Sequence, residues 1–137
     1  MNKRNAEGYP DPTAYEAIMA IVRAEKKRDY RPLVYICSPF AGDVSGNTAR
    51  ARQYCRFAVE QGAIPVAPHL LYPQFMDDND KTERALGLFF GVVLLGKCDE
   101  LWAFCDTPSS GMRLELSKAR GRGIPIKFYT TDCEVRI

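Results

Sequence analysis

The chain has 137 residues, of which 46% are hydrophobic and 26% charged, and its formal net charge is +2. This length and composition are typical of one globular domain with an apolar core. The near balance of 19 basic and 17 acidic residues argues against a nucleic-acid polymer or an anionic membrane as partner. The five cysteines lack CxxC spacing and there is a single histidine, which excludes a zinc knuckle and a multi-histidine metal site.

The N-terminal segment predicts a helix that lies on the rest of the domain or on a partner. Asp11 and Pro12 suit an N-cap and a first helical position, and apolar residues then recur at helical spacing. Residues 1–13 lack the apolar stretch of a signal peptide, so we expect a cytoplasmic protein. We expect a helical extension over residues 1–31 and an α/β domain over residues 32–137.

After this extension, short runs rich in β-forming residues alternate with longer amphipathic stretches. In chain order, we predict a strand at 33–37, a helix at 47–62, a strand at 63–68, a long loop at 69–82, a helix at 83–98, a strand at 100–105, a helix at 110–123 and a strand at 124–129. Each connection between strands is long enough for a crossover, which favours parallel pairing. We therefore predict a three-layer, Rossmann-like or flavodoxin-like α/β domain with a mostly parallel sheet of four to five strands.

The helix predicted at 83–98 contains the almost uncharged run "ALGLFFGVVLLG". This run is shorter than the roughly 18 apolar residues of a membrane span. A helix that is apolar all round is typically buried on more than one side. We therefore expect it to pack against the sheet and against a neighbouring subunit, in a homo-oligomer whose neighbour completes the pocket.

Three polar loops follow the first three predicted strands: "SPFAGDVSGN", "PHLLYPQFMDDND" and "DTPSSG". In open parallel sheets, ligands bind beyond the carboxyl ends of the strands, near the point where the strand order switches. The three loops are expected to meet there. Their convergence predicts a ligand site at this edge of the sheet.

The segment "TPSSGMRLEL" joins the last of these loops to a helix. Ser109, Ser110 and Gly111 lie where the helix begins, and its free amides and positive dipole end suit an anion such as a phosphate. Glu115 follows one turn later on the same face. Two simpler roles stay open: the serines cap the helix, and Glu115 pairs with an arginine of that helix.

Three pieces of the sequence resemble the nucleoside 2-deoxyribosyltransferase superfamily, including its 5′-monophosphate N-glycoside hydrolase branch. They are "VYICSPFAG", "CDELWAFCDTPSSGMRLEL" and "KARGRGIPIKFY", and the resemblance spans roughly residues 33 to 129. It implies that Glu115 is the nucleophile that attacks the anomeric carbon. It also implies that Ser109 contacts a 5′-phosphate, because the Pro-Ser-x-Gly run is that of the hydrolases, where the transferases have an aspartate.

The resemblance also implies a set of substrate-contacting residues. The aromatic residue of the first strand, the loop after it, the histidine after the second strand and the helix start are the positions concerned. The expected substrate-binding residues are Tyr35, Ser38, Pro39, Phe40, Gly42, Asp43, His69, Ser109, Ser110 and Gly111.

One feature departs from the family pattern. The family carries an acidic residue on the helix before "CDELW", and the corresponding helix here has none within its apolar run. Asp80, Glu83 or Arg84 are candidates to replace it. The leaving base needs a proton or a hydrogen bond, for which Asp106 and Asp43 are the candidates, with loop capping as their alternative role.

Together these features predict cleavage or transfer of the N-glycosidic bond of a nucleoside 5′-monophosphate or a (deoxy)nucleoside. No metal or redox cofactor is required by this chemistry. The alternative hypothesis is a non-catalytic nucleotide-binding or sensing module on the same fold. The missing helix acid favours the alternative, and Glu115 with its Pro-Ser-x-Gly run favours the enzyme.

Overall fold

The structure, a computed structural model, describes residues 12–27 and 30–136. The chain divides into two units between Tyr30 and Arg31. The first unit contains helix α1 (Pro12–Lys27), and its expected N-cap Asp11 lies outside the described residues. No helix within the described ranges is long and apolar enough to cross a membrane.

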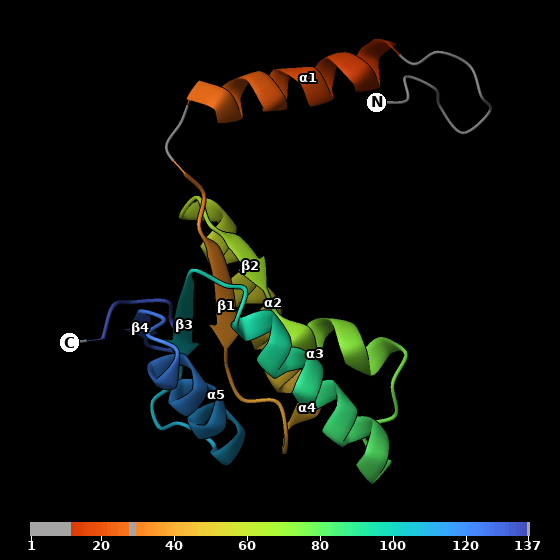
Figure 1. The fold of residues 1–137 in the computed structure, drawn as a ribbon, viewed down its shortest axis with the longest axis vertical. Helices are drawn as coiled ribbons and strands as arrows, with labels where there is room; N and C mark the ends of the chain where they lie inside the picture. The colour runs from red at the N-terminus through yellow and green to blue at the C-terminus, as the bar shows by residue number, and fades with distance from the viewer. Residues whose placement is uncertain (1–11, 28–29, 137) are drawn as a thin grey trace. The chain divides into compact units, whose positions relative to one another are not determined.

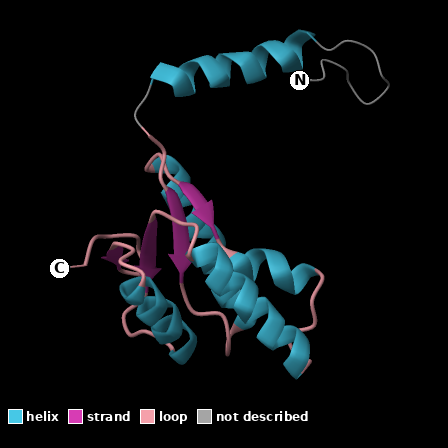
Figure 2. Ribbon diagram, in the orientation of Figure 1, coloured by secondary structure: helices cyan, strands magenta, loops and turns pink. Residues whose placement is uncertain are grey.

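The second unit is an α/β domain in which strands and helices alternate (Figures 1 and 2). Its strands are β1 (Leu33–Cys37), β2 (Ile64–Val66), β3 (Glu100–Phe104) and β4 (Ile126–Tyr129). Its helices are α2 (Val44–Glu60), α3 (Pro68–Leu71), the 3-10 turn η1 (Tyr72–Gln74), α4 (Lys81–Leu95) and α5 (Ser110–Gly121). The four strands form one parallel sheet in the order β2-β1-β3-β4, which confirms the predicted fold class.

Two predicted segments were wrong in detail. Helix α2 begins at Val44 rather than at residue 47, because the Asp43 side chain accepts a hydrogen bond from the Gly46 amide (3.1 Å) and caps the helix earlier. The segment 69–82 is not a plain loop, since it contains most of α3 and all of η1. Each of these short helices has a proline in its first turn, where proline favours helix formation.

The strand order places a switch point at the centre of the sheet. The chain goes from β1 to β2 on one side and later to β3 on the other side of β1. The connections that leave β1 and β3 therefore diverge at their carboxyl ends, which opens a space between them.

Alternation along the strands sends neighbouring residues to opposite faces of the sheet. Val34 and Ile36 of β1 pack with the aromatic cluster under α2, whereas Tyr35 and Cys37 pack in the cluster that includes residues of α4 and α5. The helices thus cover both faces (Figure 1), and the domain has three layers.

Helix α4 packs on the domain along one side only. Gly91 and Leu95 are buried. The apolar residues of its outer side are exposed, namely Leu86, Phe89 and Val93. The sequence prediction of burial against the sheet holds for one side of the helix, and a neighbouring subunit stays a prediction.

Candidate active site

A cavity of about 270 Å³ lies at the carboxyl edge of the sheet. Its walls come from the loops after β1 and β2, from the segment before α4, from one side of α4 and from the start of α5. This is the switch point of the strand order, where parallel α/β sheets bind their ligands.

Glu115 lies on the cavity wall, one turn inside α5, with its side chain half-buried. The Tyr35 hydroxyl donates a hydrogen bond to its carboxylate, and the Cys37 thiol donates one to Oε1 across 3.8 Å. Burial raises the pKa of Glu115 from 4.5 to about 7, and the two hydrogen bonds oppose that rise. A carboxyl group at this pKa changes its charge near neutral pH.

The first turn of α5 forms the adjoining part of the wall. The Ser109 side chain accepts a hydrogen bond from the Met112 amide (3.3 Å) and caps the helix. Ser110 and Gly111 are exposed and line the cavity. The first amides of a helix have no partner within it, so this end of the cavity suits an anion.

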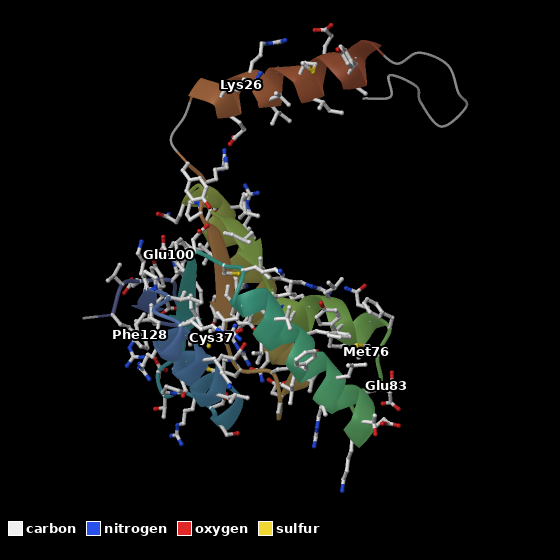
Figure 3. The ribbon with its side chains drawn as sticks, viewed as in Figure 1. Lys26, Cys37, Met76, Glu83, Glu100 and Phe128 are labelled. Carbon is white, nitrogen blue, oxygen red and sulfur yellow. The ribbon has the colours of Figure 1, made fainter. Side chains whose placement is uncertain are left out.

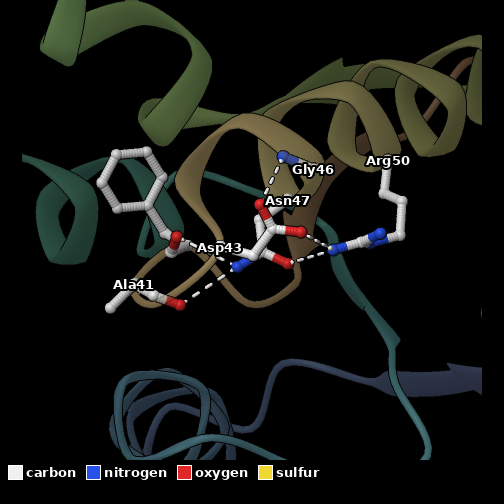
Figure 4. A network of polar contacts seen from close by, with 6 residues as sticks. Ala41, Asp43, Gly46, Asn47 and Arg50 are labelled. Atoms are coloured by element: carbon white, nitrogen blue, oxygen red, sulfur yellow. Dashed lines mark hydrogen bonds and ion pairs between the residues drawn. The ribbon is translucent and has the colours of Figure 1, made fainter.

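The loop after β1 contributes Phe40 and Ala41 to the cavity, and Asn47 of α2 holds this loop in place. The amide nitrogen of Asn47 donates to the carbonyl oxygens of Phe40 and Ala41, each at 3.1 Å (Figure 4). Arg50 donates to Asn47 Oδ1 at 2.8 Å and fixes the orientation of the amide. Asn47 was not predicted as a functional residue from the sequence. Its position near a helix start favours hydrogen bonds to backbone groups, which could have indicated this role.

His69 of α3 faces the cavity beside Ser38. Its Nε2 lies 3.4 Å from Ser38 Oγ, and its ring centroid lies 5.8 Å from that of Phe40. Burial lowers the pKa of His69 from 6.5 to about 4. The imidazole is therefore neutral at pH 7 and can form a hydrogen bond with a ligand without adding charge.

Eight of the twelve residues predicted from the sequence line this cavity: Tyr35, Ser38, Phe40, His69, Ser109, Ser110, Gly111 and Glu115. The other four, Pro39, Gly42, Asp43 and Asp106, do not line it.

Three of these four residues have distinct local environments. The carboxylate of Asp43 caps α2 and pairs with Arg50 at 3.5 Å, and it does not line the cavity. Gly42 has φ +90°, a left-handed turn conformation. Asp106 is exposed two residues after the end of β3, whereas the cavity wall of this connection begins at Ser109. The prediction that Asp106 and Asp43 reach the leaving group is therefore not supported by this geometry.

The far end of the cavity is acidic. Asp77, Asp78 and Glu83 line it together with Arg84. Figure 3 labels Glu83 in the first turn of α4 and Met76 after η1, and both residues line the cavity. Of the residues suggested as substitutes for the missing helix acid, Glu83 and Arg84 line the cavity, while Asp80 caps α4 by accepting from the amides of Thr82 (2.9 Å) and Glu83 (3.1 Å).

The two aspartates of this end were not selected from the sequence. Asp77 and Asp78 belong to the run "MDDND", which has the composition of a solvated turn. Only the fold of α3 and η1, which turns the chain back toward α4, brings them to the cavity wall.

The fold of this domain is similar to that of a solved structure. A 2-deoxyribosyltransferase from the psychrotolerant bacterium Bacillus psychrosaccharolyticus has a similar structure, with a TM-score of 0.57, 17% sequence identity and 76% of each chain covered. The domain therefore has a nucleoside deoxyribosyltransferase-like fold. Residues 32–129 match the family described as "Domain of unknown function (DUF7768)", and the chain belongs to this family. A comparison with curated protein sequences gave no match.

Proposed function

We propose that the protein cleaves or transfers the N-glycosidic bond of a nucleoside 5′-monophosphate or a (deoxy)nucleoside, with Glu115 as the nucleophile. One observation carries this proposal: a carboxyl group with a pKa near neutrality lies in the cavity, one turn from a helix start that suits a phosphate. The fold similarity to a 2-deoxyribosyltransferase supports it.

Breaking an N-glycosidic bond creates positive charge at the anomeric carbon, as in O-glycoside hydrolysis. A carboxylate beside that carbon stabilises the charge or forms a covalent ester with it. In the proposed reaction, Glu115 attacks the anomeric carbon while the base leaves with the bonding electron pair and takes up a proton. Water or a second base then attacks the same carbon, and the carboxylate is released unchanged.

The phosphate is proposed to bind at Ser109, Ser110 and Gly111. In this orientation the sugar lies over Glu115 and the base extends toward α4. Glu83 is our candidate for the proton donor to the leaving base, because it is half-buried in the wall, whereas Asp77 and Asp78 are exposed.

We also propose that the protein forms a homo-oligomer through the outer side of α4. Leu86 is 44% exposed and Phe89 is 60% exposed, which leaves an apolar surface on the side of α4 that does not line the cavity. Light scattering after size exclusion is expected to give at least the mass of a dimer, and Phe89→Lys is expected to reduce it to that of the single chain. A wild-type protein of single-chain mass would exclude the oligomer and leave the proposed chemistry unaffected.

The second candidate function is a non-catalytic nucleotide-binding module. The middle of α4 favours it, because the cavity wall there consists of Gly87, Leu88, Gly91 and Val92 and offers no acid to a base. In this reading the helix start of α5 binds a phosphate and Glu115 binds a sugar hydroxyl.

Incubation with a panel of nucleoside and deoxynucleoside 5′-monophosphates and their free nucleosides tests both candidates. Chromatography is expected to show free base with the wild-type protein. Glu115→Gln is expected to reduce release by at least about a thousandfold, because it removes the nucleophile while keeping the shape of the side chain. Glu60→Gln on the exposed side of α2 is the matched control and is expected to leave the rate unchanged.

Two results would contradict the catalytic proposal. Base release that survives Glu115→Gln would remove the assignment of the nucleophile. Nucleotide binding by calorimetry without any base release would establish the binding module instead.

A further inference from the structure

We propose that Cys37 is a positioning residue for Glu115: its thiol holds carboxylate oxygen Oε1 at the carboxyl end of β1 through a weak hydrogen bond that leaves the oxygen reactive. This inference rests on the proposed function for its catalytic meaning. The contact between Cys37 of β1 and Glu115 of α5 does not depend on that function.

The position of Cys37 supports this role. It is the last residue of β1 (Figure 3) and is fully buried, at 0% exposure. The next residue, Ser38, lines the cavity. Tyr35 lies two residues earlier, so the alternation of a strand directs both side chains to the same face. One strand thus supplies two donors to one carboxylate of α5.

The thiol has two acceptors within reach. Cys37 Sγ lies 3.8 Å from Glu115 Oε1 and 4.0 Å from the carbonyl oxygen of Met112. A thiol carries a single proton, so it can serve only one acceptor at a time. When Glu115 is ionised the carboxylate is the stronger acceptor, and when it is protonated the helix carbonyl remains available.

The Cys37 thiol keeps its proton at neutral pH. Burial, followed by the neighbouring charge of Glu115, raises the pKa of the Cys37 thiol far above its ordinary value. The side chain is therefore a donor at neutral pH, and it does not compete with Glu115 as a nucleophile.

A thiol suits this position better than a hydroxyl group. A hydrogen bond to the ionised form stabilises the carboxylate and lowers its pKa, and a strong donor does so more than a weak one. Tyr35 already supplies a hydroxyl donor. A second strong donor would make the carboxylate of Glu115 less basic. A thiol restricts the orientation of the carboxylate and lowers its reactivity less.

Other ionisable groups line the same cavity as Glu115. They come from α3, from η1, from the segment before α4 and from the first turn of α4. They are His69, Tyr72, Asp77, Asp78, Glu83 and Arg84. The shift in the pKa of Glu115 arises from burial and from Tyr35 and Cys37, so a change at Cys37 should be visible in the titration of this carboxyl group.

The test is a titration that needs no substrate. Protein labelled with ¹³C at the glutamate carboxyl carbon is titrated by NMR, and Glu115→Gln identifies the signal of Glu115. Cys37→Ala is expected to raise the pKa of Glu115 by roughly half to one unit, the size of one modest hydrogen bond. Cys37→Ser, which restores a donor, is expected to return the pKa to the wild-type value or below it.

Cys98→Ala is the matched control. Cys98 is buried in the same apolar cluster, and its thiol donates to the Leu94 carbonyl oxygen at 3.3 Å rather than to Glu115. This variant loses the same volume and is expected to leave the pKa of Glu115 unchanged. Equal shifts in Cys37→Ala and Cys98→Ala, or no shift in the former, would overturn the inference.

Two further measurements distinguish a failure of the proposed role of Cys37 from a failure of the proposed function. If Cys37→Ala does not fold, Cys37→Ser decides, because a pKa of Glu115 above the wild-type value would contradict the role of the thiol as a replaceable donor. If the wild-type protein releases base, Cys37→Ala is expected to lower kcat several-fold with KM within about twofold. If it releases none, the proposed function fails and the titration still decides on Cys37.

Discussion

The two faces of the sheet are built from the same strands but differ in kind. Under α2, aromatic rings fill the interior: Phe104 stacks on Tyr54 with 4.3 Å between ring centroids and on Tyr129 with 5.1 Å. On the other face, a carboxyl group, a tyrosine hydroxyl and a thiol meet beside a cavity. The first face is packed with apolar groups, and the second keeps polar groups partly out of water.

This difference separates stability from chemistry within one small domain. Close-packed aromatic rings contribute buried apolar area and ring contacts. A half-buried carboxyl group with a raised pKa instead reduces stability when it is ionised. Functional sites commonly carry such a penalty, which the rest of the fold must offset.

Truncation of the packed face should give the largest loss of stability. Phe104→Ala removes a ring with 0% exposure between two aromatic neighbours and is expected to reduce the free energy of unfolding by about 3–5 kcal/mol. Urea denaturation measures this loss. The pKa of Glu115 should stay unchanged, since Phe104 lies on the opposite face; a shifted pKa would show that the two faces are not independent.

Removing the charge of Glu115 should instead increase the free energy of unfolding. The folded-state pKa of Glu115 is about 7 against an ordinary value of 4.5, so the folded protein binds more protons than the unfolded chain between these values. Stability is then lost as the pH rises through this window and stays lost above it. Glu115→Gln escapes this loss and is expected to be more stable than wild type above pH 7, by up to about 3 kcal/mol.

Urea midpoints at about pH 5 and pH 8 check this prediction. The advantage of Glu115→Gln should be small at the lower pH and near its maximum at the higher pH. Glu60→Gln, on the exposed side of α2, should show little difference at either pH. A variant that is less stable than wild type at pH 8 would mean that the carboxylate is stabilised in the fold.

The packed face was easier to predict from the sequence than the polar face. Strand and helix periodicity in runs such as "LVYIC" and "ELWAFC" sufficed for the parallel α/β fold, because burial alone dictates those patterns. Glu115 and the start of α5 were predicted from their spacing and from the family resemblance. The contact of Cys37 with Glu115 was not predicted, because it depends on how deeply α5 packs against β1.

The cavity boundary was the hardest part to predict. Asp43 and Asp106 follow strands just as Ser38 and Ser109 do, and the sequence pattern treats all four alike. Local capping removes Asp43 from the cavity wall, and the geometry of an exposed turn removes Asp106. The capping role of Asp43 was the alternative that the sequence left open, whereas the position of Asp106 depends on tertiary packing.

Helix α4 contains two glycines with different surroundings, Gly87 and Gly91. A Cβ atom at Gly91 would lie 3.2 Å from the Tyr35 hydroxyl oxygen, whereas one at Gly87 would meet nothing within 4 Å. Gly87→Ala is expected to stabilise the helix by roughly 0.5–1 kcal/mol, because alanine favours helices over glycine. Gly91→Ala is expected to lose this gain and to destabilise the domain by about 1 kcal/mol through overpacking.

The pair also tests the coupling of α4 to the carboxyl group. Displacement of the Tyr35 hydroxyl by Gly91→Ala should weaken its hydrogen bond to Glu115 and raise the pKa of that carboxyl group. Gly87→Ala should leave the pKa unchanged. Thermal unfolding and the carboxyl titration measure the two effects, and identical behaviour of the two variants would contradict the close approach of α4 to Tyr35.

The smallest expected effect on stability concerns the start of α5. Gly111 lines the cavity and a Cβ there would meet nothing within 4 Å, so Gly111→Ala should change the free energy of unfolding by only a few tenths of a kcal/mol. An added methyl group would nevertheless crowd a phosphate approaching the helix amides. KM for nucleoside monophosphates is expected to rise roughly tenfold, the effect of about 1.4 kcal/mol, while KM for free nucleosides stays constant. Gly121→Ala, at the other end of α5 and equally open, should alter neither value. Equal increases for monophosphates and nucleosides would move the phosphate away from this helix start.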